Sequence, residues 1–181
     1  SIGSSRRSSR YCKLSCSKPS TKKADAASYK AYLCLQTAKF TFRNQHDDAK
    51  FSNKLQNTTN KLSKNSVKFK DTTMKKGKKT YTVQLTGLNK CIAKDKTFNT
   101  LYVDTNIKGK DKKKVTVTNV NVFFDGKKVK TIKKGVLTPD PGQTDGFVQL
   151  QIINMWNSRV AKFKYTMPKK TIKVTYTVKI K

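Results

Sequence analysis

The segment Thr171–Lys181 alternates strictly between apolar and polar side chains. Side chains of a β-strand point alternately to its two faces, so this period of two predicts an extended strand. Its apolar face carries Ile172, Val174, Tyr176, Val178 and Ile180. Its other face carries only Lys and Thr, which predicts an antiparallel sheet with one face on a core and one in water.

Similar patterns recur along the chain from Tyr29 onward. Tyr81, Val83 and Leu85 repeat the alternation cleanly, whereas the apolar parity between 115 and 124 switches at Thr118-Asn119 and predicts a β-bulge there. The segments expected to form strands are 29–42, 67–73, 81–87, 98–107, 115–124, 127–134, 147–156, 161–165 and 171–181. Residues 51–67 are compatible with a short helix or with an irregular loop.

Polar segments separate the expected strands. Asp125-Gly126 lies between two of them and predicts a tight hairpin. Met74–Lys79 is expected to be a charged turn, and Lys108–Lys114 a basic loop. Many short strands with frequent turns and little helical periodicity predict an all-β fold, an antiparallel β-sandwich, with a closed β-barrel as the alternative.

Composition divides the chain into two parts. Residues 1–27 are rich in Ser, Arg and Lys and poor in apolar side chains, which predicts a flexible basic tail. Residues 28–181 carry the strand pattern and are expected to form one β-sandwich domain. In its first strand, Leu33 and Leu35 share one face. The opposite face is expected to carry Tyr32, Cys34, Phe40 and Phe42.

The charge of the chain points to a class of partner. There are 41 Lys and Arg against 10 acidic residues, a formal net charge of +31. Attraction to polyanions is therefore expected. Most of the cations are Lys, which lacks the bidentate geometry of Arg, so such binding would not depend on sequence. A solvated surface adapted for solubility is the alternative interpretation.

Lysine clusters supply the predicted contacts to a polyanion. The residues are Lys112, Lys113, Lys114, Lys127, Lys128, Lys133 and Lys134. Although they are separated in sequence, their segments could converge at one end or on one face of a sandwich. No RNA-recognition sheet motif, helix-turn-helix or zinc finger is present, so nucleic-acid binding is expected only as nonspecific electrostatic attraction.

Few residues are suited to catalysis or to metal binding. A nucleophile and base pair would require His46, which lies in a polar run without a nucleophile motif. Glycoside hydrolysis needs two carboxylates, but the chain has no Glu and its positive field lowers carboxyl pKa values. We therefore expect no enzyme, no cofactor and no catalytic metal. Asp47-Asp48 and expected loops around Asp104, Asp140 and Asp145 could supply oxygen ligands to a structural calcium ion, but turns and caps are the favoured explanation of these residues.

The four cysteines indicate an oxidising compartment. They are Cys12, Cys16, Cys34 and Cys91. An even number of scattered cysteines favours disulfides in an exported protein over a zinc site, and their pairing stays open. The cysteines therefore lead us to expect a secreted or cell-surface location. No apolar run is long enough to span a membrane.

The single tryptophan, Trp156, ends an expected strand and is surrounded by Asn154, Asn157 and Arg159. A flat aromatic face beside amide and guanidinium donors is typical of a sugar-binding surface. A core tryptophan followed by a polar loop would give the same sequence. Both interpretations stay open.

Several short motifs also resemble a known type of module. In chain order they are 31–37, Phe42-Arg43-Asn44, 99–103, 124–127, 153–157 and 167–172. Together, over residues 29–181, they resemble a β-sandwich module of secreted proteins and lipoproteins of anaerobic, gut-type Firmicutes, similar in character to carbohydrate-binding modules. Two features depart from that module: Gln45-His46 stands where an aromatic residue is expected, and the lysine content is unusually high.

These observations predict a non-catalytic extracellular or cell-surface binding module that contacts glycans or anionic envelope polymers. One alternative is a structural subunit of a surface assembly or filament, a homo-oligomer joined through edge strands or through tail cysteines. The other is a sequence-independent nucleic-acid or polyanion binder.

Overall fold

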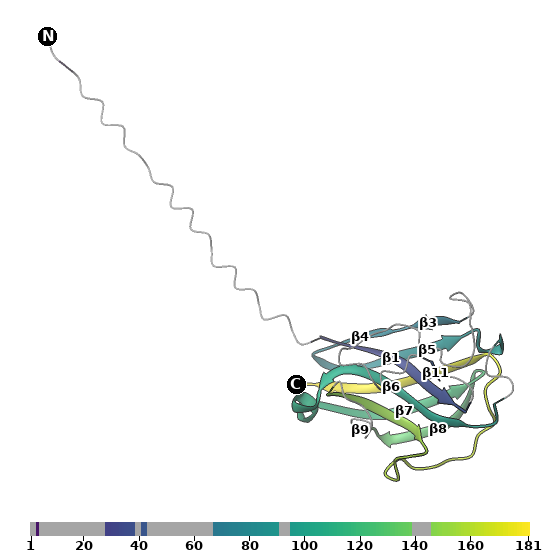
Figure 1. The fold of residues 1–181 in the computed structure, drawn as a ribbon. Helices are drawn as coiled ribbons and strands as arrows, with labels where there is room; N and C mark the ends of the chain where they lie inside the picture. Colours follow the sequence, from purple (N-terminus) through teal and green to yellow (C-terminus); the bar gives the residue numbers. More distant parts are fainter. Residues whose placement is uncertain (1–2, 4–27, 39–40, 43–66, 91–94, 139–145) are drawn as a thin grey trace.

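The computed structural model describes residues 3, 28–38, 41–42, 67–90, 95–138 and 146–181. In these residues two antiparallel sheets pack face to face and do not close into a barrel (Figure 1). The predicted all-β sandwich is therefore confirmed. Residues 1–27, apart from the exposed Gly3, and residues 51–66 lie outside the described residues, so the basic tail stays a prediction.

The first sheet, sheet A, has the strand order β2-β1-β6-β10-β9, and β4 also pairs with β1. Its strands are β1 (Ser28–Thr37), β2 (Thr41–Phe42), β4 (Thr72–Lys75), β6 (Phe98–Lys108), β9 (Val136–Thr138) and β10 (Phe147–Asn154). Sheet B has the order β3-β5-β11-β7-β8. Its strands are β3 (Lys68–Lys70), β5 (Gly77–Thr86), β7 (Val115–Phe124), β8 (Lys127–Lys134) and β11 (Thr171–Ile180). Two short 3-10 helices, η1 (Leu88–Lys90) and η2 (Gly109–Lys114), connect strands.

The alternating segment at 171–181 is the central strand of sheet B. β11 pairs with β5 on one side and with β7 on the other. Its five apolar side chains are almost completely buried, whereas the intervening Thr and Lys side chains lie on the outer face of the sheet. Full burial of such a side chain contributes roughly 1.5–3 kcal/mol to folding, which explains why the period of two sets the register.

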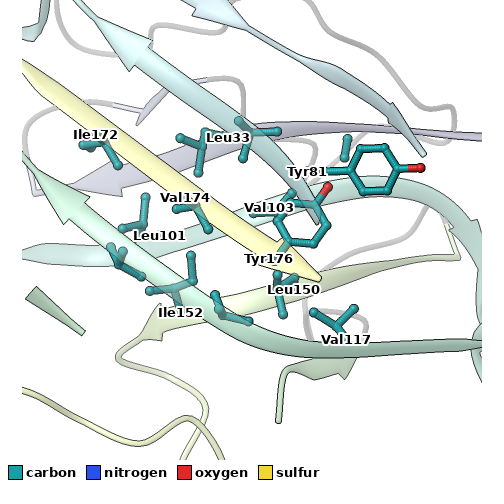
Figure 2. Close-up of a cluster of buried hydrophobic side chains, with 14 of the residues drawn as sticks. Leu33, Tyr81, Leu101, Val103, Val117, Leu150, Ile152, Ile172, Val174 and Tyr176 are labelled. Carbon is teal, nitrogen blue, oxygen red and sulfur yellow. The ribbon is translucent and has the colours of Figure 1, made fainter. Parts of the chain in front are cut away.

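The core lies between the two sheets. Figure 2 shows side chains from both layers pointing toward one another, among them Val174 of β11, Leu101 of β6 and Ile152 of β10. Tyr81 and Tyr176 pack within it with ring centroids 6.2 Å apart. The predicted division of the first strand is found for four of its residues: Leu33 and Leu35 belong to this core, while Tyr32 and Cys34 form a separate buried cluster with Tyr102. Phe40 and the side chain of Phe42, predicted on the Tyr32 face, lie outside the described part of the structure.

Two local predictions are confirmed by backbone geometry. The pairing of β11 with β7 shifts register between Thr175 and Thr177, opposite Asn119, whose φ is 50°. This is the predicted bulge. Asp125 and Gly126 have φ values of 52° and 82°, as the tight turn of a two-residue hairpin requires.

Both edges of the sandwich are formed by a segment that changes sheet. At one edge, β3 pairs with β5 of sheet B, and after Asp71 the chain continues as β4 beside β1 of sheet A. At the other edge, β8 pairs with β7, and after Gly135 the chain continues as β9 beside β10. Gly135 lies close to the core, because an added Cβ would be 2.8 Å from side-chain atoms of Leu150 and Val117.

Five segment predictions were wrong. Residues 29–42 are not one strand but two, β1 and β2, paired through Leu35 and Phe42. Residues 67–73 contribute to two strands in different sheets, and the expected turn at 74–79 is mostly strand. Residues 161–165 are irregular, since they cross between the sheets instead of pairing at an edge. The basic loop at 108–114 is largely the helix η2.

Pairing defines two opposite ends of the sandwich. We call one the Trp156 end, where β10 finishes at Asn154 and β7 at Phe124, and the other the η2 end, where β6 finishes at Lys108 beside Phe147. Seven residue steps along β10 separate them by roughly 24 Å. Within the described residues, no helix has the length and apolar character needed to cross a bilayer.

Candidate binding surfaces

Trp156 lies at the surface. Its side chain is 58% exposed and that of Met155 is 56% exposed, and these are the exposed large hydrophobic residues of the described chain. Both occupy the turn that follows β10. The interpretation of Trp156 as a core residue is therefore wrong, because β10 has already left the space between the sheets at this point.

Asn154 and Asn157 shape the turn that presents Trp156. The Asn154 Oδ1 accepts a hydrogen bond from the Trp156 backbone N–H at 3.0 Å, and its Nδ2 donates to the Gln151 Oε1 at 3.2 Å. Asn157 Oδ1 accepts from the backbone N–H of Arg159 at 3.0 Å. Since Asn154 is only 5% exposed and uses both ends of its amide internally, it positions the turn and offers little to a ligand.

A groove with a volume of about 580 Å³ opens beside this turn. Its walls come from the start of β6, the end of β10 and the irregular segment that follows. The lining residues are Thr97, Phe98, Asn99, Ile153, Asn154, Met155, Val160, Ala161, Lys162, Phe163, Lys164 and Tyr165. The Met155 N–H donates to the Asn99 carbonyl at 2.9 Å and so fixes the start of the turn against β6.

An aromatic cluster forms one wall of the groove. The Phe98 ring lies 5.7 Å from those of Phe124 and Tyr165, and Tyr165 lies 5.4 Å from Phe163. The Tyr165 hydroxyl accepts a hydrogen bond from the Phe98 N–H at 2.9 Å. Partial burial raises the pKa of Tyr165, and this hydrogen bond opposes the rise only in part. The hydroxyl is therefore neutral and fixed at physiological pH.

Sequence reasoning missed this groove. In the sequence, the segment Ala161–Tyr165 predicts a strand, because Phe163 and Tyr165 alternate with lysines. Nothing in that alternation distinguishes a paired strand from an extended segment packed on an aromatic cluster. Phe98, which packs against Tyr165, lies far away in the sequence, so this contact could be found only from the three-dimensional arrangement.

The predicted polyanion-binding lysines do not converge at one end of the sandwich. Lys127 and Lys128 begin β8 at the Trp156 end. At the η2 end lie the other members of the set, Lys112, Lys113, Lys114, Lys133 and Lys134. Of these, the Lys114 Nζ is 3.4 Å from the Asp111 Oδ1, so part of its charge is neutralised.

Two of the described carboxylates are buried inside the fold. Asp104, expected in a loop, is completely buried in β6, where its Oδ1 accepts from the Thr105 N–H at 2.9 Å. Asp95 is also buried, and the Thr37 hydroxyl donates to it at 2.5 Å. No three His, Cys or acidic residues of the described chain gather into a metal-binding group. The calcium candidates Asp47, Asp48, Asp140 and Asp145 lie outside the described residues, as does His46.

Of the four cysteines, the structure describes one. Cys34 is completely buried beside Tyr32 and Tyr102. Cys12, Cys16 and Cys91 lie outside the described residues, so the disulfide pairing stays a prediction.

Comparisons with protein families, with curated proteins and with solved structures find no match to this chain. The resemblance to a module of Firmicutes proteins therefore stays an expectation from the sequence.

Proposed function

We propose that this chain is a non-catalytic binding module, outside the cell or at its surface, that contacts glycans or anionic envelope polymers. The observation that supports this most directly is the exposure of Trp156 beside an aromatic groove. An exposed tryptophan is costly in water, and sugar rings stack their apolar faces on such a surface. In this proposal Trp156 stacks on the sugar, Arg159 and Asn157 donate hydrogen bonds, and Asn154 holds the turn.

The groove offers contacts for further sugar units beyond the one that stacks on Trp156. Its wall offers the rings of Phe98, Phe163 and Tyr165, and its rim offers the amide of Asn99 and the ammonium groups of Lys162 and Lys164. A site that combines apolar walls with a few polar groups is typical of small-ligand recognition. The two lysines favour an acidic sugar or a phosphorylated chain over a neutral one.

Glycan arrays at low and high salt test this function. Binding that persists at high salt and falls at least about tenfold in Trp156→Ala, a loss of roughly 1.4 kcal/mol, is the expected result. Phe123→Ala serves as the matched control, because Phe123 is a partly exposed aromatic residue on the outer face of sheet B, covered by the Lys173 ammonium at 4.4 Å. Absence of binding at either salt concentration would refute the proposal.

A second candidate, sequence-independent polyanion binding, is favoured by the outer face of sheet B. The strands of this sheet contain eleven Lys and no acidic residue. Lys70, Gln84, Lys173, Phe123 and Lys128 form one row across it in register. Binding of this kind releases counterions, so its affinity falls linearly with the logarithm of the salt concentration, and Trp156→Ala leaves it unchanged.

The third candidate is a structural subunit of a surface assembly or filament. One edge of sheet B is the strand β8, which contains five lysines. Such a charged edge opposes the addition of a strand from another copy of the chain. Assembly would then use another edge or intermolecular disulfides. Size-exclusion measurements with and without reductant decide this, since a monomer in both conditions argues against it.

A further inference from the structure

A second pocket lies at the η2 end of the sandwich, with a volume of about 670 Å³. It is an open pocket bordered by η2, by the first residues of β7 and by the corner between β8 and β9. The described lining residues are Gly109, Lys110, Lys112, Lys113, Val115, Thr116, Val117, Lys134, Gly135, Val136 and Leu137.

The change of sheet at Gly135 explains why a pocket exists here. The last pair between β7 and β8 is Thr118 with Lys134, and the chain then leaves sheet B to pair Val136 with Gln151 in sheet A. The first residues of β7, 115–117, therefore have no described strand beside them on the side where β8 pairs with the rest of β7. The corner is fixed, since the Gly135 N–H donates to the Val117 carbonyl at 2.8 Å.

Apolar and cationic groups are segregated in this pocket. Its inner surface is formed by Val115, Val117 and Leu137, which are almost completely buried, and by the half-buried Val136. The lysines of η2 and Lys134 supply the polar atoms of the rim.

No acidic residue is among the described residues that line the pocket. The neighbouring Asp111 pairs with Lys114 at 3.4 Å, and neither of these two lines the pocket. The positive charge at the rim is therefore uncompensated, and an anion placed there would form charge-assisted hydrogen bonds.

We propose that this pocket binds a small organic anion, in which a phosphate or carboxylate group is attached to an apolar body. The lysines Lys110, Lys112, Lys113 and Lys134 hold the anionic group, and the valine and leucine surface takes the body. The pocket volume lies in the usual range for small-molecule sites. Apart from the lysines, Thr116 is the one described lining residue with a hydrogen-bonding side chain, so the lining suits such a body better than the hydroxyl groups of a sugar. This site is independent of the glycan site, because it lies at the opposite end of the sandwich.

Isothermal titration calorimetry of the full chain tests the assignment with phenyl phosphate, inorganic phosphate and phenol. We expect phenyl phosphate to bind at least about tenfold more tightly than either fragment, because only phenyl phosphate uses both parts of the pocket. The double variant Lys112→Gln/Lys134→Gln should lose at least about tenfold in affinity for it. The double variant Lys127→Gln/Lys128→Gln removes two charges at the other end of β8 and should change the affinity less than about twofold. All four lysines are exposed, and far-UV circular dichroism checks that both variants fold.

Equal weakening in the two double variants would overturn the proposal, because general attraction to a cationic surface would then explain the binding. Inorganic phosphate binding as tightly as phenyl phosphate would overturn it too, since the apolar surface would contribute nothing. Fluorescence of Trp156 separates the two ends of the molecule: it should stay constant as phenyl phosphate is added. A fluorescence change together with loss of binding in Trp156→Ala would assign the anion to the other site.

Discussion

Replacing Asp125 tests how the loops at the Trp156 end are joined. The Asp125 Oδ1 accepts the backbone N–H groups of Lys170 and Thr171 at 2.7 and 2.9 Å, and its Oδ2 accepts that of Lys169 at 2.7 Å. The residue itself has a φ of 52°. One side chain therefore ties the β7–β8 turn to the start of β11.

The cost of each substitution follows from this geometry. The side chain is exposed, so water can replace much of what is lost, and the three hydrogen bonds together contribute about 1 kcal/mol. A positive φ costs Ala about 1–2 kcal/mol more, whereas Gly tolerates it. Asp125→Ala should therefore destabilise the fold by about 2–3 kcal/mol, and Asp125→Gly by about 1 kcal/mol. Asp125→Asn, which accepts the backbone conformation and keeps one oxygen, should cost about 0.5–1 kcal/mol.

The pH dependence of stability provides a second test of the role of the Asp125 carboxylate. Partial burial, the largest single influence, raises the pKa of Asp125, but the three N–H groups and the Lys169 charge together outweigh it and hold the pKa below 3.8. Because the unfolded chain then binds the proton more readily, the contribution of Asp125 is complete above the unfolded pKa and is lost as the pH falls through the folded pKa. The difference between the wild type and Asp125→Asn should therefore be constant above about pH 5 and shrink below 3.8.

Urea unfolding followed by far-UV circular dichroism measures these differences, provided that the slope with denaturant stays constant. Asp111→Asn is the control, because it removes the same charge, and its partly exposed pair with Lys114 should contribute less than about 1 kcal/mol. Equal stability of Asp125→Ala and Asp125→Gly would refute the argument from φ. A difference between the wild type and Asp125→Asn that persists undiminished at pH 3 would refute the argument from the carboxylate.

Three further changes probe the core and the turn. Gly135→Ala should cost about 1–3 kcal/mol in urea unfolding, because its Cβ would lie 2.8 Å from core side chains. Burial raises the pKa of Tyr176, whose hydroxyl donates to the Met74 Sδ at 3.1 Å, so stability should fall as the pH rises above about 10. Consequently, Tyr176→Phe should leave the tyrosinate absorbance of the native chain at pH 11 unchanged and lower that of the unfolded chain. Asn154→Ala should cost about 1–3 kcal/mol and shift the emission of Trp156, since a buried hydrogen-bond partner is lost.

Alternation along single strands predicted much of this fold. The period of two at 171–181 and 81–85 determined which side chains are buried, and the parity switch at Thr118-Asn119 located a bulge. The Asp125-Gly126 turn followed from residue types that accept positive φ. These features depend on neighbours in sequence, which is why they could be read from one chain.

The changes of sheet at Asp71 and Gly135 could not be predicted. Each is a bend in a continuous extended segment, and the choice between sheets depends on partners distant in sequence, such as Gln84 for Lys70 and Tyr29 for Met74. The same limit applies to the candidate site. Trp156 and its neighbours were found from composition, but the groove needs Phe98, which lies far earlier in the chain.

The position of β11 also determines when sheet B can form. β5 and β7 are not neighbours in this sheet, since β11 lies between them. Residue 171 pairs with residue 86, and residue 180 with residue 77, so these contacts close very long loops. During synthesis, β5 and β7 must remain without their shared partner until Thr171–Ile180 has emerged. We expect slow folding that ends in one late step, during which the exposed edges of β5 and β7 are protected from aggregation chiefly by the mutual repulsion of a highly cationic chain.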